Sequence, residues 1–165
     1  TVDGDSELYL GGPNTQFYKG NFEFHPVRKH AYYNISGQVQ LNGQDVFWSP
    51  RTTLIIASVP EAADFWSKVP GAAPYDEAEG YYTFPCSRPP AVSFTFDKGK
   101  RWPVRAVDMN LGRVSYKAKL CVGAIAGVDV GLGQNTWILG GTFMKNVYTL
   151  FDPADSHTVG FAQLA

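Results

Sequence analysis

Ser49 and the three histidines are the residues whose side chains could support nucleophilic hydrolysis. In such an enzyme a histidine takes the proton of the serine hydroxyl, and the two side chains lie within hydrogen-bond reach. The histidines are His25, His30 and His157. The residues around Ser49 read Trp-Ser-Pro-Arg, which differs from the Gly-x-Ser-x-Gly turn that presents a nucleophilic serine at the end of a strand. The sequence therefore does not favour a serine hydrolase.

Metal and cofactor sites are not indicated either. A zinc site uses closely spaced histidines or cysteines, but His25 and His30 bracket a turn and neither cysteine stands in a Cys-x-x-Cys pair. The glycines at 123–127 and 131–133 lack the strand, glycine-rich loop and helix that bind a nucleotide. We expect no metal and no cofactor, and each histidine is predicted to lie at the surface or at a strand edge.

The two cysteines, Cys86 and Cys121, lie far apart in the sequence and are predicted to form a disulfide. In the chain-entropy model a loop of this length stabilises the fold by about 4 kcal/mol. The alternative is a pair of buried, reduced thiols. Asn34-Ile35-Ser36 is an acceptor tripeptide for N-glycosylation at Asn34, and together with a disulfide it favours a secreted protein.

The composition excludes several classes of protein. Lys and Arg number 14 against 15 Asp and Glu, and the net charge of -1 argues against a nucleic-acid partner, which requires excess positive charge. No run approaches the ~20 apolar residues that span a bilayer, so no membrane partner is expected. Aromatic residues make up 15% of the chain, with 17 Gly and 11 Pro, which is typical of a turn-rich β protein. We expect a single domain over residues 1–165, because one core supports a chain of this length.

Most elements that must position these residues are predicted to be strands. Apolar and polar residues alternate at 21–25 and 92–96, so that Phe22 and Phe24 share one face of the first strand. Turns are expected at 42–43 and 98–100. Further strands are expected at 8–10, 32–41, 52–57, 103–107, 114–125, 147–151 and 158–162.

One helix is predicted at 58–69. Ser58 and Glu61 match a capping box, and Pro60 lies in the first turn. Pro70 then ends the pattern. The apolar residues that recur at helical spacing, and that we expect in the core, are Ala62, Phe65, Trp66 and Val69.

Charged residues gather in two further segments. The segment 71–82 is expected to be an exposed loop that carries Asp76, Glu77 and Glu79. Between Asp97 and Cys121 only Asp97 and Asp108 oppose a run of cations, which we expect to lie on a solvated strand face. These cations are Lys98, Lys100, Arg101, Arg105, Arg113, Lys117 and Lys119.

Two groups of segments stand near the beginning and the end of the chain. The first reads SELYLGGPNT at 6–15, FYKG at 17–20 and FHPV at 24–27. The second reads WILG at 137–140, NVYTLFD at 146–152 and VGFA at 159–162. In this order they resemble the C-terminal lobe of a pepsin-like aspartic protease of the fungal, polyporopepsin-like branch. The resemblance implies a mostly β fold, a single pepsin-like lobe that is half of a two-lobed enzyme, with one or two short helices and a Cys86–Cys121 disulfide.

The resemblance also implies a catalytic aspartate, and here the chain departs from the family. The family reads Asp-Thr-Gly before Thr-Thr-Leu, whereas this chain has Ser49, Pro50 and Arg51 at those three positions. Catalysis needs two carboxylates that share one proton, which a serine hydroxyl cannot hold at working pH. Neither Asp-Thr-Gly nor Asp-Ser-Gly occurs in the chain, and Gly141 stands where the closing signature usually has Asp. Asp45 lies too far along its strand to replace the missing carboxylate.

We therefore predict a secreted, non-catalytic binding protein, a pseudo-protease built on one lobe. It is expected to bind a protein, a peptide or, as in a lectin, a glycan, or to associate with a second copy of itself, through the former interlobe or cleft face. A separate N-terminal lobe is the other expected partner. The alternative is the C-terminal chain of a two-chain or processed aspartic endopeptidase whose N-terminal lobe is a separate polypeptide. The residues expected to contact a ligand in the former cleft are Trp48, Ser49, Arg51, Thr52, Thr53, Ile138, Gly140, Gly141 and Thr142.

Overall fold

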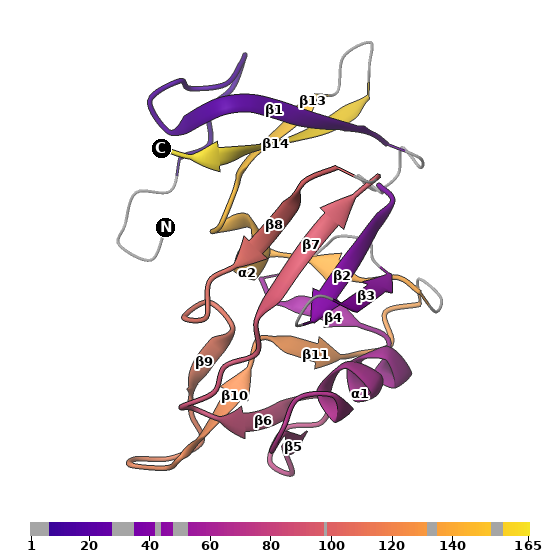
Figure 1. Ribbon diagram of the computed structural model, residues 1–165, viewed down its shortest axis with the longest axis vertical. Coiled ribbons are helices and arrows are strands. Elements are labelled where there is room, and N and C mark those ends of the chain that lie inside the picture. The colour runs from indigo at the N-terminus through magenta and orange to yellow at the C-terminus, as the bar shows by residue number, and fades with distance from the viewer. Residues whose placement is uncertain are drawn as a thin grey trace.

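A computed structural model of the chain describes residues 7–27, 35–41, 44–47, 53–97, 99–131, 135–152 and 157–165, with the backbone alone at 44–47. These residues form a mostly β protein with two short helices (Figure 1), which confirms the expected fold class. The helices are α1 (Val59–Ser67) and α2 (Gly141–Met144). The first seven strands are β1 (Tyr18–Pro26), β2 (Gly37–Leu41), β3 (Gln44–Phe47), β4 (Ile55–Ala57), β5 (Ala73–Pro74), β6 (Tyr82–Pro85) and β7 (Val92–Phe96). The others are β8 (Arg101–Val104), β9 (Asn110–Arg113), β10 (Leu120–Gly123), β11 (Ile125–Gly127), β12 (Ile138–Leu139), β13 (Tyr148–Asp152) and β14 (Thr158–Leu164).

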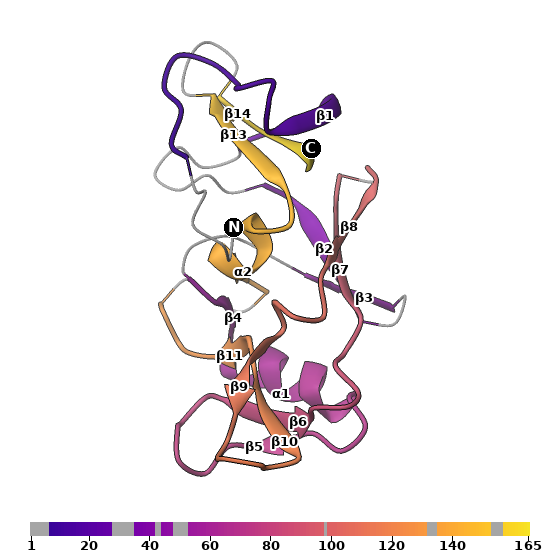
Figure 2. The same ribbon diagram turned by 90° about the vertical axis from the view of Figure 1, so that its left-hand side faces the viewer.

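The described strands form small sheets that follow one another along the long axis of the molecule. At one end lies the antiparallel sheet β1-β14-β13, which pairs strands from both ends of the chain. Next come the antiparallel sheet β3-β2-β7-β8 and the sheet β11-β4-β12. At the other end the sheet β5-β6-β10-β9 lies close to α1, as both views show (Figures 1 and 2).

Helix α1 forms as predicted and packs through a buried aromatic pair. Phe65 and Trp66 are buried, and the Trp66 indole stacks near Tyr82 and Phe84, with ring centroids 5.8 and 5.9 Å away. Its Nε1 donates to the Ile125 carbonyl at 3.0 Å, so the polar atom of this ring is satisfied. The start of α1 differs from a capping box. The Ser58 hydroxyl donates to the Glu61 carboxylate at 2.6 Å and does not cap a backbone N–H.

A second aromatic cluster joins the sheet β1-β14-β13 to the sheet β3-β2-β7-β8. Phe96 and Phe161 stack with ring centroids 4.8 Å apart, and Phe143 of α2 packs edge-on against both. All three side chains are buried. Because β7 and β14 each contribute a ring, this cluster fixes the sheet β1-β14-β13 against the rest of the lobe.

His25 is buried, so the predicted surface position is wrong for this residue, although β1 is an edge strand of its sheet. It is 3% exposed, with Nδ1 3.2 Å from the Asp97 carboxylate and Nε2 2.9 Å from the Glu23 carboxylate. Nδ1 forms a hydrogen bond with the Asp97 carboxylate, whereas Nε2 and the nearby Glu23 Oε1 are buried close together without a hydrogen bond. His157 is exposed, as expected, and His30 lies outside the described residues.

Several strand boundaries also differ from the prediction. Residues 8–10 form no strand, and the expected strand at 103–107 is β8, which ends at Val104. The expected strand at 114–125 is divided into a turn, β10 and β11, and the chain changes partners at Ala124, whose N–H donates to the Met109 carbonyl at 3.1 Å. Strand β10 pairs with β6 and β9, whereas β11 pairs with β4, and apolar alternation carries no information about such a change.

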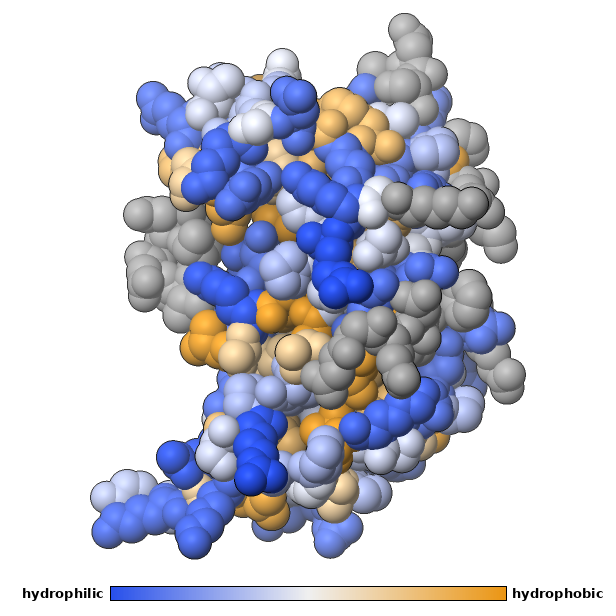
Figure 3. All heavy atoms as spheres, viewed as in Figure 1, coloured by the Kyte–Doolittle hydropathy of each residue, from blue (hydrophilic) through white to orange (hydrophobic). Residues whose placement is uncertain are grey.

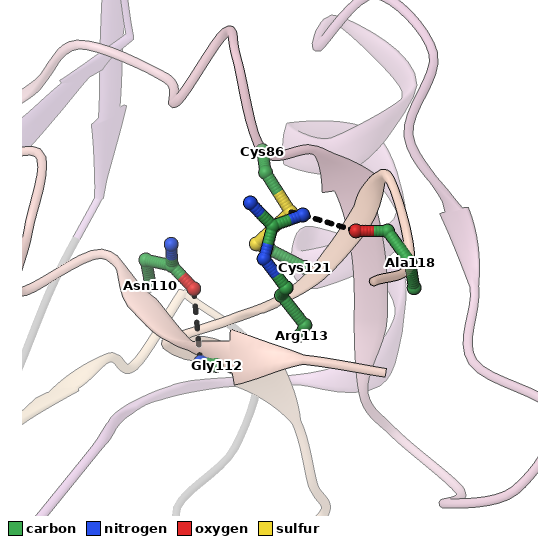
Figure 4. The surroundings of a disulfide bond; sticks show 6 residues. All are labelled: Cys86, Asn110, Gly112, Arg113, Ala118 and Cys121. Carbon is green, nitrogen blue, oxygen red and sulfur yellow. Dashed lines mark hydrogen bonds between the residues drawn. A yellow bond between two sulfur atoms is a disulfide. The ribbon is translucent and has the colours of Figure 1, made fainter. Parts of the chain in front are cut away.

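Cys86 and Cys121 form a disulfide, as predicted, with their Cα atoms 5.1 Å apart. The bond joins the residue after β6 to β10, and the Cys86 N–H also donates to the Lys119 carbonyl at 2.9 Å. It thereby anchors the hairpin formed by β9 and β10 to the neighbouring strand (Figure 4). Within the described parts of the chain, neither helix is long and apolar enough to cross a membrane.

Candidate functional site

Strand β4 positions the start of the candidate site. It runs parallel to β11 and antiparallel to β12, with Ile55 opposite both Ile125 and Leu139. These three side chains are buried, as expected for a short strand held between two neighbours. The pairing fixes the backbone at Thr53 and Leu54, which directly precede β4.

The start of α2 is hydrogen-bonded to these two residues. The Gly140 N–H donates to the Leu54 carbonyl at 3.0 Å, and the Thr142 N–H donates to the Thr53 carbonyl at 2.9 Å. The Thr142 hydroxyl donates to the same Thr53 oxygen at 3.2 Å. A Cβ at Gly141 would lie 3.3 Å from that oxygen, so a glycine suits this close approach of two backbones. We call this contact of residues 53–54 with 140–142 the Thr53–Thr142 junction.

The exposure of these residues limits which of them could touch a ligand. Thr53 is exposed and Gly141 is half-buried. Ile138 is 3% exposed and Thr142 is 5% exposed, so both are held inside the lobe by packing and hydrogen bonds. Of the predicted contact residues that the structure describes, only Thr53 is exposed and Gly141 half-buried, whereas Ile138, Gly140 and Thr142 lie inside the lobe.

Glu61 is the first acidic residue that follows Thr53 and Leu54 in the sequence, and its carboxylate holds parts of the lobe together. Its Oε1 accepts a hydrogen bond from the Trp137 indole at 3.1 Å, and its Oε2 accepts one from Ser58 at 2.6 Å. Trp137 is fully buried. Glu61 therefore fixes α1 against the segment that leads into β12. On the N-terminal side the nearest carboxylate is Asp45 of β3, which pairs with Gln40 of β2.

Known proteins of one family match this chain over nearly its whole length. A family model described as eukaryotic aspartyl protease covers residues 1–164. The chain belongs to the eukaryotic aspartyl protease family. An aspartic protease of Phaffia rhodozyma is 38% identical over 172 residues, which cover 96% of this chain and 41% of that protein.

Two further members show the same coverage. Major aspartyl peptidase 1 of Cryptococcus neoformans is 31% identical over 185 residues, 99% of this chain and 37% of that protein. Cathepsin D of Bos taurus is 30% identical over 171 residues, 96% of this chain and 43% of that protein. The chain thus spans about two fifths of the length of these relatives.

The altered motif lies outside the described residues. This applies to Trp48, Ser49, Pro50, Arg51 and Thr52, which connect β3 to Thr53, and also to the glycosylation candidate Asn34. The role of Ser49 at the aspartate position therefore stays a prediction from the family pattern.

A hydrogen-bond relay behind the junction was missed by the sequence reasoning. The Asn146 amide donates to the Thr142 carbonyl at 2.9 Å and accepts from the Arg105 N–H at 3.0 Å. Arg105 in turn forms a 2.8 Å ion pair with Asp108, whose carboxylate is buried. The only sequence signal was the place of Asn146 in the closing signature of the family. Within the described ranges no three His, Cys, Asp or Glu side chains are grouped to hold a metal ion.

Proposed function

We propose that this lobe is a non-catalytic member of the aspartyl protease family that acts by binding a protein partner. The proposal has two parts. The lobe supplies no catalytic carboxylate, and it associates with a second copy of itself through an exposed aromatic surface. Each part rests on a different observation.

The observation that carries the proposal is the absence of acidic residues from the sequence around the altered motif. The sequence from Val46 to Pro60 contains neither Asp nor Glu. The hydrogen bonds of the Thr53–Thr142 junction are nevertheless complete, so the backbone that follows the altered motif keeps a defined position. A lobe with serine at the aspartate position has no carboxylate there to share a proton with a second aspartate.

The sheet at the end of the lobe supports the binding part. Tyr18, Phe22, Phe24 and Tyr148 form one continuous set of rings, with neighbouring centroids 4.7 to 5.9 Å apart. We call this set the aromatic face. Phe24 is 52% exposed, and Gly160 of β14 lies beneath the Phe22 and Phe24 rings. Tyr18, Phe22 and Tyr148 are half-buried, so Phe24 is the exposed member of the face. Exposed aromatic groups are typical of interaction surfaces.

Secretion is part of the same proposal. The Cys86–Cys121 disulfide persists in oxidising compartments, such as the extracellular space, and is rare in the cytosol. The Asn34 acceptor tripeptide points in the same direction. Mass measurement of the native protein before and after glycosidase treatment would test whether Asn34 carries a glycan.

The second candidate is one lobe of an aspartic endopeptidase whose other lobe is a separate polypeptide. It is favoured by the coverage of the relatives, which are more than twice as long as this chain. In that assembly the aromatic face would meet the other lobe instead of a second copy. The site would still have one carboxylate in place of two.

The catalytic part is tested with denatured haemoglobin at acid pH, with and without a pepstatin-like inhibitor. We expect no inhibitor-sensitive cleavage by the chain, because serine stands at the aspartate position and catalysis needs two carboxylates. An active pepsin-like protease serves as the positive control. Inhibitor-sensitive cleavage by the wild-type chain would overturn the non-catalytic assignment.

The binding part is tested by sedimentation velocity over a range of protein concentrations. We expect a dimer that is at least tenfold weaker in a Phe24→Ser variant. The matched control is Val107→Ser, because Val107 is 64% exposed and lies away from the aromatic face. A strictly monomeric wild-type chain at high concentration, or equal weakening by both variants, would contradict self-association.

A further inference from the structure

The hairpin of β9 and β10 carries an uncompensated positive charge. Between Met109 and Val128 the sequence has Arg113, Lys117 and Lys119 and no acidic residue. We call residues 110–123 the basic hairpin. In Figure 3 its tip projects from the lower left of the molecule as an arm of mainly hydrophilic residues. The cations are exposed, as expected, but they lie on a hairpin and its turn and not on one strand face.

The tip of the basic hairpin forms an open hollow of about 810 Å³. The side chains that line it are Arg113, Ser115, Tyr116 and Lys117. Each of the four carries an N–H or O–H donor, and none carries a negative charge. A surface of donors with two permanent cations is suited to an oxyanion.

The hollow is held in place by the disulfide. Arg113 lies opposite Cys121 across the hairpin, and its Nη1 donates to the Ala118 carbonyl and lies 3.9 Å from the Cys86 sulfur (Figure 4). The Ala118 N–H closes the turn by donating to the Ser115 carbonyl at 3.0 Å. The Arg113 guanidinium is therefore oriented before any ligand arrives, which lowers the entropic cost of binding.

The charges at the tip are not neutralised within the described part of the lobe. Asp108, the nearest acid in the sequence, is paired with Arg105. Lys117 and Lys119 form no ion pair with any residue that the structure describes, and the Lys117 ammonium lies 5.2 Å from the centre of the Tyr116 ring. Tyr116 is 90% exposed, so its ring is available beside the two cations.

We propose that the basic hairpin binds an anionic carbohydrate chain through its sulfate or phosphate ester groups. Arg113 and Lys117 contact the ester oxygens, and the Tyr116 ring packs against an adjacent sugar. At the tip, residues 114–119, the exposed large side chain is Tyr116, but Leu111 and Leu120 further along the hairpin are 45% and 40% exposed. A lipid bilayer is therefore the competing contact that the test must separate. The proposal is independent of the proposed function, since it uses neither the junction nor the aromatic face.

The test measures binding of the full chain to a sulfated heparin hexasaccharide by calorimetry. We expect binding that weakens as salt is raised, and no binding of the desulfated hexasaccharide. An Arg113→Gln, Lys117→Gln double variant should bind at least tenfold more weakly, and Tyr116→Ala several-fold more weakly. The matched control is a Lys19→Gln, Lys145→Gln double variant, which removes the same charge from exposed positions elsewhere and should bind like the wild type.

Three results would overturn the proposal. The first is equal loss of binding in the hairpin and control variants, which would mean that net charge alone attracts the ligand. The second is binding to phosphatidylserine vesicles without binding to the hexasaccharide, which would mean a membrane contact. The third is equally tight binding of a single-stranded oligonucleotide of the same charge, which would mean that no sugar is recognised. Circular dichroism and thermal unfolding of each variant verify the fold.

Discussion

Gly123 at the end of β10 provides a quantitative test of the packing around α1. A Cβ at this position would lie 2.2 Å from two carbons of the Trp66 indole, Cη2 and Cζ2. Carbon atoms in contact are normally about 3.5–4.0 Å apart, so the overlap exceeds about 1 Å. Gly123 has no positive φ, and its replacement by alanine therefore introduces a steric conflict and no backbone strain.

The indole cannot move away without further losses. Its Nε1 is hydrogen-bonded to the Ile125 carbonyl, and Tyr82 and Phe84 lie parallel to the ring. Overpacking typically costs about 1–3 kcal/mol, and this site belongs at the upper end of that range. We expect Gly123→Ala to lower the free energy of unfolding by about 3 kcal/mol and Tm by about 6–12 °C.

A double-mutant cycle separates the steric conflict from other effects. Trp66→Phe removes Cη2 and Cζ2, so alanine at position 123 should then cost less than about 1 kcal/mol. Urea denaturation of the wild type, the two single variants and the double variant gives the coupling, which we expect to be about 2 kcal/mol in favour of the double variant. Costs that add within about 0.5 kcal/mol would refute the geometry of this contact.

Three other predictions concern stability and ionisation. Replacing Cys86 and Cys121 together by alanine should lower the free energy of unfolding by about 4 kcal/mol in the chain-entropy model, and a loss below about 1 kcal/mol in urea would contradict that account. Asn146→Ala should lower the free energy of unfolding by about 1–2 kcal/mol and speed hydrogen exchange at the Arg105 amide, which donates to the Asn146 side chain. If the Arg105 amide stays as protected in this variant as in the wild type, the relay is not formed. The hydrogen bond from Tyr75 to Glu77 raises the pKa of the phenol above its usual 10.0, so the bond is lost as pH rises through that raised pKa. Glu77→Gln should lower this pKa in an NMR titration, and an unchanged midpoint would exclude the contact in solution.

Elements whose structure is set by neighbouring residues could be predicted from the sequence, and elements set by distant strand partners could not. The strand at 92–96 and the helix that begins after Ser58 follow from apolar spacing, and both form as expected. The division of 114–125 between two sheets does not follow, because it depends on the distant partners of β10 and β11. The disulfide was predicted because the chain has two cysteines, neither in a Cys-x-x-Cys pair, and because the resemblance to the family implies that they are bonded.

The candidate site was predictable as a set of segments but not as contacts. The family pattern places Thr53 and Gly141 near the altered motif, and the structure joins them through the Thr142 hydrogen bonds. The pattern gives no means of separating residues that face a ligand from residues that support the backbone. Burial makes that separation, since Thr53 is exposed whereas Ile138 and Thr142 are not.

Strand β1 shows why the direction of a face matters for function. Alternation correctly places Phe22 and Phe24 on one face, but Phe24 is exposed and Phe22 half-buried, whereas His25 on the other face is buried. His25 is held inside by the hydrogen bond between its Nδ1 and the Asp97 carboxylate at 3.2 Å. The exposed rings gain no comparable stabilisation in water, and a partner that covered them would bury apolar area at about 25 cal/mol per Å². Replacing Phe24 by serine should therefore weaken association far more than it changes the stability of the isolated lobe.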